Sequence, residues 1–248
     1  MISLALIGYG KMGKMIELAL SGAERSLVNP AEFNLAGKYD VINPVKEHLK
    51  DKVDVAIEFS TPQSVIENIE FLASKGINIV CGTTGWYEKS DEVKKIVEKS
   101  NIGFIYASNF SVGVNIFFQI VKQTAELIDK YRQYNIGIEE THHTQKLDKP
   151  SGTAIRIAEY LLEKIQRKES ITNDKTDLSP AELNIVSKRI ENVVGNHQVI
   201  FTSEADSIIL EHNANSRKGF AEGALLAAKF IHNKKGFYKF EDIFNNLT

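Results

Sequence analysis

The stretch Ile2-Ser3-Leu4-Ala5-Leu6-Ile7-Gly8-Tyr9-Gly10-Lys11-Met12-Gly13 decides the fold of this chain. Its first part, residues 2–7, is an apolar run that predicts a buried strand. Glycines at three spaced positions follow without a gap, and apolar residues then recur with helical spacing at Met12, Met15, Ile16, Leu18 and Ala19. The pattern is a strand, a G-x-G-x-x-G turn and a helix, which is the context that a dinucleotide-binding fingerprint requires.

This turn suits a bound pyrophosphate for two physical reasons. Glycine lets the backbone approach the ligand closely, and the free amides at the start of the helix stabilise its negative charge. Lys11 either pairs with a phosphate or is simply solvated. A tight strand–helix turn without a ligand is the alternative interpretation. We expect cofactor contacts from Gly8, Gly10, Lys11, Met12 and Gly13.

Further apolar runs continue the alternation of strands and helices. We predict strands at 33–40, 53–59, 77–81 and 103–107, and we expect the last of these to end the series. Helices are predicted between them, at 44–50, 63–75 and 88–100. Alternation at this spacing predicts an α/β fold with a Rossmann-like, doubly wound parallel sheet, which binds ligands at the carboxyl ends of its strands.

Small and polar residues stand where three of these strands end. They are Ser60 and Thr61, then Gly82, Thr83 and Thr84, and finally Ala107, Ser108, Asn109 and Phe110. Each group alone could be a turn, but three strand ends in register with the glycine loop favour a cofactor groove. Asp40, at the end of the second strand, is the candidate acid for the cofactor's ribose, and a plain surface aspartate is nearly as good an explanation.

The pattern changes after residue 109. A long amphipathic helix is predicted at 111–131, a strand at 135–140, a helix at 153–167 and a polar loop at 168–179. Strands at 182–189, 199–203 and 208–213 and a helix at 217–230 complete the chain. The order of these elements predicts an α+β domain with a mixed sheet.

The string Glu139-Glu140-Thr141-His142-His143-Thr144-Gln145-Lys146-Leu147-Asp148-Lys149-Pro150-Ser151-Gly152-Thr153-Ala154 concentrates groups that suit a small anionic substrate. It holds two adjacent imidazoles, an ammonium four residues after the first, and a Ser-Gly-Thr turn that opens a helix. Ser151 is a plausible N-cap, and a capped helix start still presents amides to a carboxylate. Together with the glycine turn, the string indicates a nicotinamide-dependent reductase.

Each residue of this string also has a less specific explanation. His142 and His143 could be ordinary surface histidines, and Lys146 a solvated charge. A metal site is disfavoured, because no spaced carboxylate or cysteine set completes a ligand shell and adjacent side chains in an extended loop diverge. We therefore predict no metal.

Composition narrows the class of protein and of partner. The chain has 248 residues, 43% of them apolar and 25% charged, and a formal net charge of -2, which give no general attraction to nucleic acid or to anionic lipid. No apolar run reaches the roughly 20 residues that span a bilayer. Met1 leads directly into the first strand, which leaves no room for a signal peptide. The single Cys81 fits a reducing, cytoplasmic location.

These residues resemble the 4-hydroxy-tetrahydrodipicolinate reductase (dihydrodipicolinate reductase) family of bacterial lysine and diaminopimelate synthesis. The likeness runs along nearly the whole chain. It is strongest at 8–13, 58–62, 82–85, 107–115, 142–154 and 213–227. The His-His-x-x-Lys-x-Asp-x-Pro-Ser-Gly-Thr-Ala string is close to diagnostic.

The resemblance implies a domain organisation, a reaction and site residues. Residues 1–109 with 217–248 would form the dinucleotide domain, and 110–216 the substrate and oligomerisation domain of a homotetramer. NAD(P)H would reduce a small cyclic dicarboxylate, with hydride delivered to C4 of its ring. Catalytic positions fall at His142 and Lys146, which would supply or relay a proton, and substrate contacts fall at His143, Ser151, Gly152 and Thr153.

Two departures from the family pattern bear on affinity and cofactor. Thr144 and Gln145 stand where many members carry Arg-His, so the pocket is less positive and substrate affinity is expected to be lower. Val41 stands where an arginine often meets the 2′-phosphate of NADPH, and arginine binds phosphate bidentately. We therefore expect NADH to be used at least as well as NADPH, with Lys38 or Lys11 as the residues implicated if NADPH is preferred.

Two other functions are compatible with parts of the sequence. One is a two-domain reductase or amino-acid dehydrogenase that acts on another small anion, which would have no reason to carry the 142–154 string. The other is a catalytically silent dinucleotide-binding protein, for which His142 or Lys146 should be missing while the glycine turn survives. Both residues are present.

Overall fold

The computed structural model describes residues 1–22, 26–49 and 52–244 and divides the chain into two compact units. The first unit is Met1–Val112 with Arg217–Thr248, and the second is Gly113–Ser216. The chain passes from the first unit to the second after Val112, whereas the predicted boundary follows residue 109. The reason is packing: the ring of Phe110 is buried in the core of the first unit, against Phe59 and Phe240.

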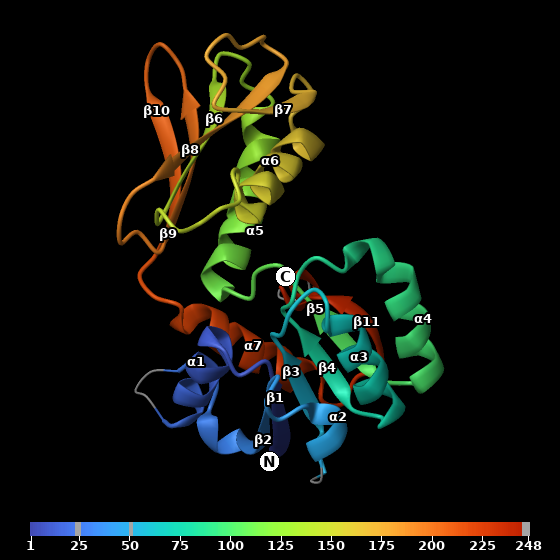
Figure 1. Cartoon of the computed structure of the whole chain (residues 1–248). Helices are drawn as coiled ribbons and strands as arrows, with labels where there is room; N and C mark the ends of the chain where they lie inside the picture. The colour runs from blue at the N-terminus through green and yellow to red at the C-terminus, as the bar shows by residue number, and fades with distance from the viewer. Residues whose placement is uncertain (23–25, 50–51, 245–248) are drawn as a thin grey trace. The chain divides into compact units, whose positions relative to one another are not determined.

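The first unit is built on a six-stranded, wholly parallel sheet (Figure 1). In sheet order its strands are β11 (Gly236–Lys239), β5 (Gly103–Tyr106), β4 (Asn78–Cys81), β3 (Val55–Glu58), β1 (Ile2–Ile7) and β2 (Phe33–Tyr39). The predicted doubly wound sheet is therefore confirmed. The expectation that the strand near 103 ends the series is wrong, because β11 pairs with β5 from far along the chain.

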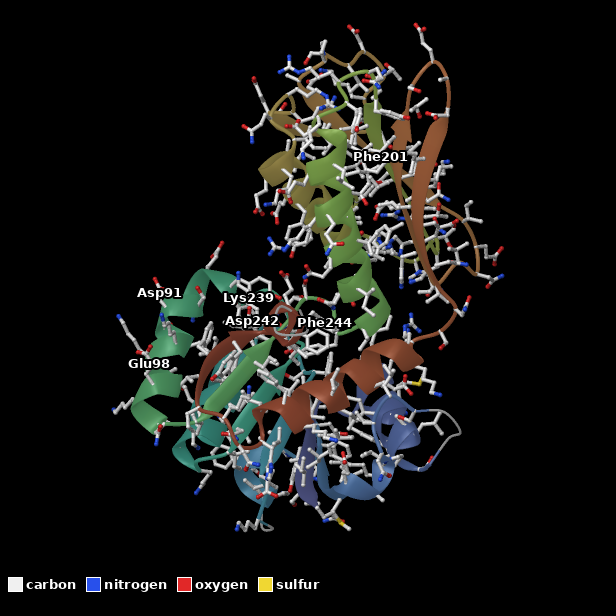
Figure 2. The ribbon with its side chains drawn as sticks, turned by 180° about the vertical axis from the view of Figure 1, so that it is seen from behind. Asp91, Glu98, Phe201, Lys239, Asp242 and Phe244 are labelled. Carbon is white, nitrogen blue, oxygen red and sulfur yellow. The ribbon has the colours of Figure 1, made fainter. Side chains whose placement is uncertain are left out.

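Helices cover both faces of this sheet, because successive side chains of a strand point to opposite faces. Leu4 and Leu6 of β1 pack with α1 (Lys11–Leu20) and α7 (Lys218–Ile231). Ala5 and Ile7 pack on the other side with α3 (Val65–Ser74) and α4 (Ser90–Ser100). Asp91 and Glu98 lie on the exposed side of α4 (Figure 2).

Short elements complete the first unit. They are α2 (Val45–His48) and three 3-10 turns, η1 (Pro30–Glu32), η2 (Tyr87–Lys89) and η3 (Phe240–Ile243). Asp242 of η3 accepts a hydrogen bond from the backbone N–H of Lys239, which fixes the turn after β11 (Figure 2).

The second unit is a mixed five-stranded sheet with helices on one face. In sheet order the strands are β10 (Ser207–Ala214), β9 (Gly195–Thr202), β6 (Asn135–His142), β8 (Glu182–Arg189) and β7 (Ser170–Asn173). Helices α5 (Val112–Ile128) and α6 (Gly152–Lys164) pack on it over an apolar core that includes the fully buried Phe201 (Figure 2). The predicted mixed sheet is confirmed.

Several boundaries in this unit differ from the sequence prediction, among them the start of β9, which is Gly195 instead of residue 199. The segment 168–179, predicted as a loop, contains β7, an edge strand that pairs only with β8 and whose residues are exposed or half-buried. Strand β6 runs to His142 instead of ending at 140, since pairing with β8 continues to that residue. His142 therefore sits on a strand and is buried. Across the residues that the structure describes, no helix is long and apolar enough to cross a membrane.

Candidate functional site

The turn after β1 is shaped so that only glycine fits at its first position. Gly8 has φ +87°, in the left-handed region, and a Cβ there would collide with the backbone carbonyl of Phe59 at the end of β3. The Gly8 N–H donates to the carbonyl of Tyr39 at 2.8 Å. The turn is thus clamped between the ends of β2 and β3, where an α/β sheet binds its ligands.

A groove of about 480 Å³ opens beside this turn. It brings together part of the predicted cofactor set, namely Gly8, Gly10, Asp40, Ser60 and Thr61. Helix α1 starts at its edge, and within the described residues no side chain caps Gly10 and no acid lies in the first turn of α1. Its first backbone amides are therefore left for an anion. Lys11 at this helix start is exposed.

Asp40 lies in the groove, but its carboxylate is partly engaged by its own turn. Its Oδ1 accepts from the N–H groups of Ile42 and Asn43 at 2.9 and 3.0 Å. The nearby ammonium of Lys38 bonds the Glu17 carboxylate at 3.0 Å. Val41 is almost fully exposed. The strand end therefore carries a carboxylate that its own turn holds in place, while the lysine two positions before it is already paired.

The other predicted cofactor residues do not line this groove. Thr83 is buried and its carbonyl accepts from the indole N–H of Trp86 at 2.8 Å, whereas Thr84 is exposed. Asn109 accepts from the backbone N–H of Ser111 at 2.8 Å. The ring of Phe110 belongs to the core, so its side chain has a packing role. The remaining members of the set are Met12 and Gly13 in α1, Gly82 beside the ring of Phe59, and Ala107 and Ser108 after β5.

A buried carboxyl group that was not among the predicted site residues connects the end of β3 with the end of β4. Glu58, the last residue of β3, is fully buried and accepts hydrogen bonds from the Ser60 hydroxyl and from Asn68 Nδ2, the latter at 3.3 Å. The thiol of Cys81 lies 3.7 Å from its other oxygen. Burial raises the pKa of Glu58 and of Cys81. Cys81 thus has a buried structural role.

In the second unit, His142 lies at the end of β6 within a buried polar cluster. Its Nε2 lies 3.3 Å from Glu140 Oε2 and 3.3 Å from His197 Nε2. Glu140 is fully buried, and its Oε1 accepts from the Ser151 N–H at 3.0 Å and from Arg189 Nη1 at 3.3 Å. Three of these residues, Glu140, Arg189 and His197, are absent from the sequence-based site.

The charge state of Glu140 follows from its partners. Burial alone would raise its pKa, but hydrogen bonds from His142, Ser151 and Ser187 outweigh burial and hold the pKa well below its usual range. Burial, reinforced by His142, lowers the pKa of His197 to about 3. At neutral pH the cluster therefore contains an anionic Glu140 and a neutral His197.

The cluster also bears on the prediction of no metal. Glu140, His142 and His197 offer ligand atoms within 4.8 Å of one another, a group that the sequence alone does not bring together because His197 is distant in the chain. Glu140, however, is already neutralised by Arg189 and held by the Ser151 amide. A hydrogen-bonded cluster accounts for these contacts, and the absence of a metal stays a prediction.

Lys146 follows in the loop and is paired with an acid. Its ammonium lies 2.8 and 2.7 Å from the two carboxylate oxygens of Asp148. A backbone bond from the Lys146 N–H to the His143 carbonyl, 3.1 Å, folds the loop back on itself. Arg189 also donates to the carbonyls of Lys146 and Asp148. The loop is thereby fixed to the end of β8.

The start of α6 forms the third part of this region. Ser151 caps the helix by accepting from the Ala154 N–H at 3.2 Å, as predicted. Gly152 is exposed and Thr153 half-buried, and a Cβ at Gly152 would meet nothing within 4 Å. The space in front of the helix start is therefore open to a ligand. His143 Nδ1 is buried and has no hydrogen-bond partner among the residues that the structure describes.

Comparison with known proteins bears on the whole chain. The model of the family "Dihydrodipicolinate reductase, N-terminus" matches residues 2–110, and that of "Dihydrodipicolinate reductase, C-terminus" matches 113–244. A 4-hydroxy-tetrahydrodipicolinate reductase of Christiangramia forsetii is 38% identical over 248 residues, which cover 99% of each chain. One of Methanosarcina barkeri is 33% identical over 264 residues, covering 98% of this chain and 99% of the other.

A solved structure agrees with these sequence matches. It is a dipicolinate-bound dihydrodipicolinate reductase from Paenisporosarcina sp. TG-14, with a TM-score of 0.73 and 25% identity, covering 98% of this chain and 99% of that one. Family models that together span nearly the whole chain, relatives above 30% identity and a matching fold lead to one assignment. The chain belongs to the dihydrodipicolinate reductase family.

Proposed function

We propose that this protein reduces 4-hydroxy-tetrahydrodipicolinate to tetrahydrodipicolinate with a nicotinamide cofactor, in lysine and diaminopimelate biosynthesis. The observation that carries the proposal is the 142–154 segment, whose imidazoles, ammonium and open helix start stand together in a chain of this family. The glycine turn and its groove in the first unit fit the cofactor. When bound, that cofactor supplies the hydride.

The start of α6 binds one carboxylate of the substrate. Gly152 and Thr153 are at the first turn of the helix, where the helix dipole favours negative charge. His143 assists, because its buried and unpartnered Nδ1 can donate a hydrogen bond to that carboxylate. Ser151 supports this subsite by holding the helix start in place.

Lys146 supplies the proton that the reduced ring requires, and His142 supports this transfer. An ammonium is a proton donor as well as a positive partner for a dicarboxylate. Its bond to Asp148 keeps the side chain ordered before substrate arrives. Substrate carboxylates would compete with Asp148 for the same ammonium.

NADH is the preferred or equal cofactor in this proposal. The carboxylate of Asp40 lies in the groove and would accept from a ribose hydroxyl but repel a 2′-phosphate. Lys38, the nearest cation on β2, is paired with Glu17. Lys46, which also lines the groove, is paired with Glu67 at 3.0 Å.

A coupled assay tests the reaction and the cofactor together. The substrate is generated from pyruvate and aspartate semialdehyde by the preceding synthase, and oxidation of NADH and of NADPH is followed at 340 nm (~1 mM substrate, of the order of typical KM values). We expect synthase-dependent oxidation with a kcat/KM for NADH at least equal to that for NADPH. Asp40→Ser should shift this ratio about 10-fold toward NADPH, since a charge repulsion of about 1.4 kcal/mol is removed.

Two outcomes would count against the proposal. Binding of NADH without any synthase-dependent oxidation would point to a changed substrate or a silent binding protein. A wild-type preference for NADPH that Asp40→Ser leaves unchanged would show that the acid does not set the choice. Lys38→Ala and Lys11→Ala would then locate the phosphate partner.

We also propose a cytoplasmic homotetramer assembled through the sheet of the second unit. Both helices of that unit lie on one face of the sheet, where Ile136 and Ile138 are buried. The alternate residues of β6 and β9 are only half-buried, and Ile209 of the edge strand β10 is 56% exposed. Such an uncovered sheet face with an apolar edge is suited to pairing with another copy.

Light scattering after size exclusion checks this assembly. The expected mass is four times that of the 27.8 kDa chain. Replacement of Ile209 by lysine should lower the mass to that of a smaller species, because a buried lysine without a partner opposes association. A wild-type protein that runs as a monomer at micromolar concentration would contradict the tetramer.

A further inference from the structure

Strand register brings a second histidine to His142. Strands β6 and β9 are antiparallel, with Glu140 directly opposite His197. Alternate residues of a strand share a face, so Glu140 and His142 of β6 lie on the same face as His197 of β9. All three side chains are buried. The sheet itself therefore fixes the mutual positions of a carboxylate and two imidazoles.

A glycine makes room for the ring of His142. A Cβ at Gly195, two residues before His197 on β9, would lie 3.1 Å from Cε1 and 3.3 Å from Nδ1 of His142. These separations are shorter than ordinary van der Waals contacts, so any larger residue would push on the ring. One side of the His142 ring therefore packs against the backbone of β9 at Gly195.

The contacts also assign the roles of the ring nitrogens. His142 Nε2 lies 3.3 Å from the carboxylate of Glu140, an anion that can only accept, so the Nε2 of His142 carries a proton and donates it. The contacts to Glu140 and to His197 both involve Nε2, so Nδ1 lies outside this pair of contacts. His197 is neutral and lies edge-on to His142, with ring centroids 5.0 Å apart. A neutral neighbour holds the ring without adding a second buried charge.

We propose that Glu140 and His197 are positioning residues that lock the ring and the tautomer of His142 for proton transfer. This inference rests on the proposed function, because it assumes that His142 takes part in the reaction. His197 acts through His142 and not on the substrate. Ser151 connects His197 to the substrate subsite. Its hydroxyl lies 3.3 Å from His197 Nε2 and also caps α6.

The consequence is a specific dependence of turnover on a residue far away in sequence. Removal of the His197 ring leaves a void beside His142 and frees its imidazole to turn. Misplacement of a catalytic group by about 1 Å can cost roughly 100-fold in rate. We expect His197→Leu to lower kcat by roughly 10- to 100-fold with little change in KM for either substrate. His197→Gln, whose amide reaches the Nε2 position, should restore part of the rate.

A double-mutant cycle tests this inference. kcat and KM are measured with synthase-generated substrate for the wild type, His142→Ala, His197→Leu and the double variant, with thermal unfolding as a control for folding. If His197 acts through His142, the His197→Leu change should lower kcat less than about twofold once His142 is already alanine. Additive effects, or a rise in KM instead of a fall in kcat, would overturn the proposal.

A second variant and a structural readout keep the test independent of stability and of activity. Gly195→Ala adds one methyl group against the His142 ring and should lower kcat, as His197→Leu does. The same substitution should leave kcat unchanged when it is made in the His142→Ala variant. Crystal structures of His197→Leu and Gly195→Ala should show the His142 ring displaced from Glu140. An unmoved ring would refute the positioning role, whereas a wild type without turnover would count against the proposed function alone.

Discussion

Lys146→Ala should lower kcat by about 100-fold or more, while the protein keeps its fold and binds NADH normally. The expected size follows from the role proposed for the ammonium, since a positioned proton donor typically contributes a factor of 10² to 10⁴. Lys146 is part of a loop that backbone and arginine contacts already fix. The substitution therefore removes a donor and a charge without releasing the loop.

The neighbouring loop offers a matched control for this prediction. Lys149 lies three residues further on and is likewise ion-paired, with Asp174 at 2.7 Å, but it is 44% exposed in its side chain. Lys149→Ala should leave kcat within about twofold, because exposed pairs contribute little. Steady-state measurement of kcat for both variants tests whether Lys146 is the proton donor. Near-normal turnover of Lys146→Ala, or equal losses in the two variants, would exclude Lys146 as the proton donor.

Gly8→Ala should abolish cofactor binding and destabilise the first unit by roughly 3 kcal/mol or more. A left-handed conformation alone costs a residue with a side chain about 1–2 kcal/mol. At Gly8 the added methyl group also collides with the Phe59 carbonyl, so β1 and β3 must separate at the edge where the groove opens. The added Cβ atom thus causes both the loss of stability and the loss of the cofactor-binding surface.

A second glycine separates these two contributions. Gly76 also has a left-handed φ, +72°, but a Cβ there would meet nothing within 4 Å. Gly76→Ala should cost only the conformational term of about 1 kcal/mol and should bind NADH normally. Urea unfolding and fluorescence titration with NADH measure both quantities. Similar free energies of unfolding for the two variants would show that the collision is relieved by local movement.

The parts of the fold that sequence predicts best are those fixed by local patterns. The glycine turn with its flanking apolar periods predicts β1 and α1, and the runs of buried aliphatic residues predict β3 and β4. Strand β11 escapes prediction because its residues are half-buried or exposed, unlike the fully buried β3 and β4, and because it is a strand only through pairing with β5. Strand β7 escapes for the related reason that its side chains are largely polar and at the edge of a sheet.

The same distinction applies to the candidate site. His142, Lys146 and Ser151 stand within one string and are visible in it, whereas His197 joins them across 55 residues through strand register. One signal was available: Gly195, His197, Val199 and Phe201 alternate as the buried residues of β9, which places the histidine on the apolar face. The pairing of Lys146 with Asp148 depends on side-chain geometry in a loop, which no periodicity encodes.

The divided first unit has a consequence for the order in which the protein is synthesised. Its chain leaves at Val112 and returns at Arg217 to supply α7 and β11. Helix α7 provides much of one face of the core, with Ala221, Ala224, Leu225, Ala228 and Ile231 all buried. During synthesis, the second unit, which is continuous in sequence, is therefore complete before α7 has been made. Until then the corresponding face of the amino-terminal sheet stays uncovered. A nascent chain of this protein should accordingly need protection from aggregation until residues 217–248 have emerged.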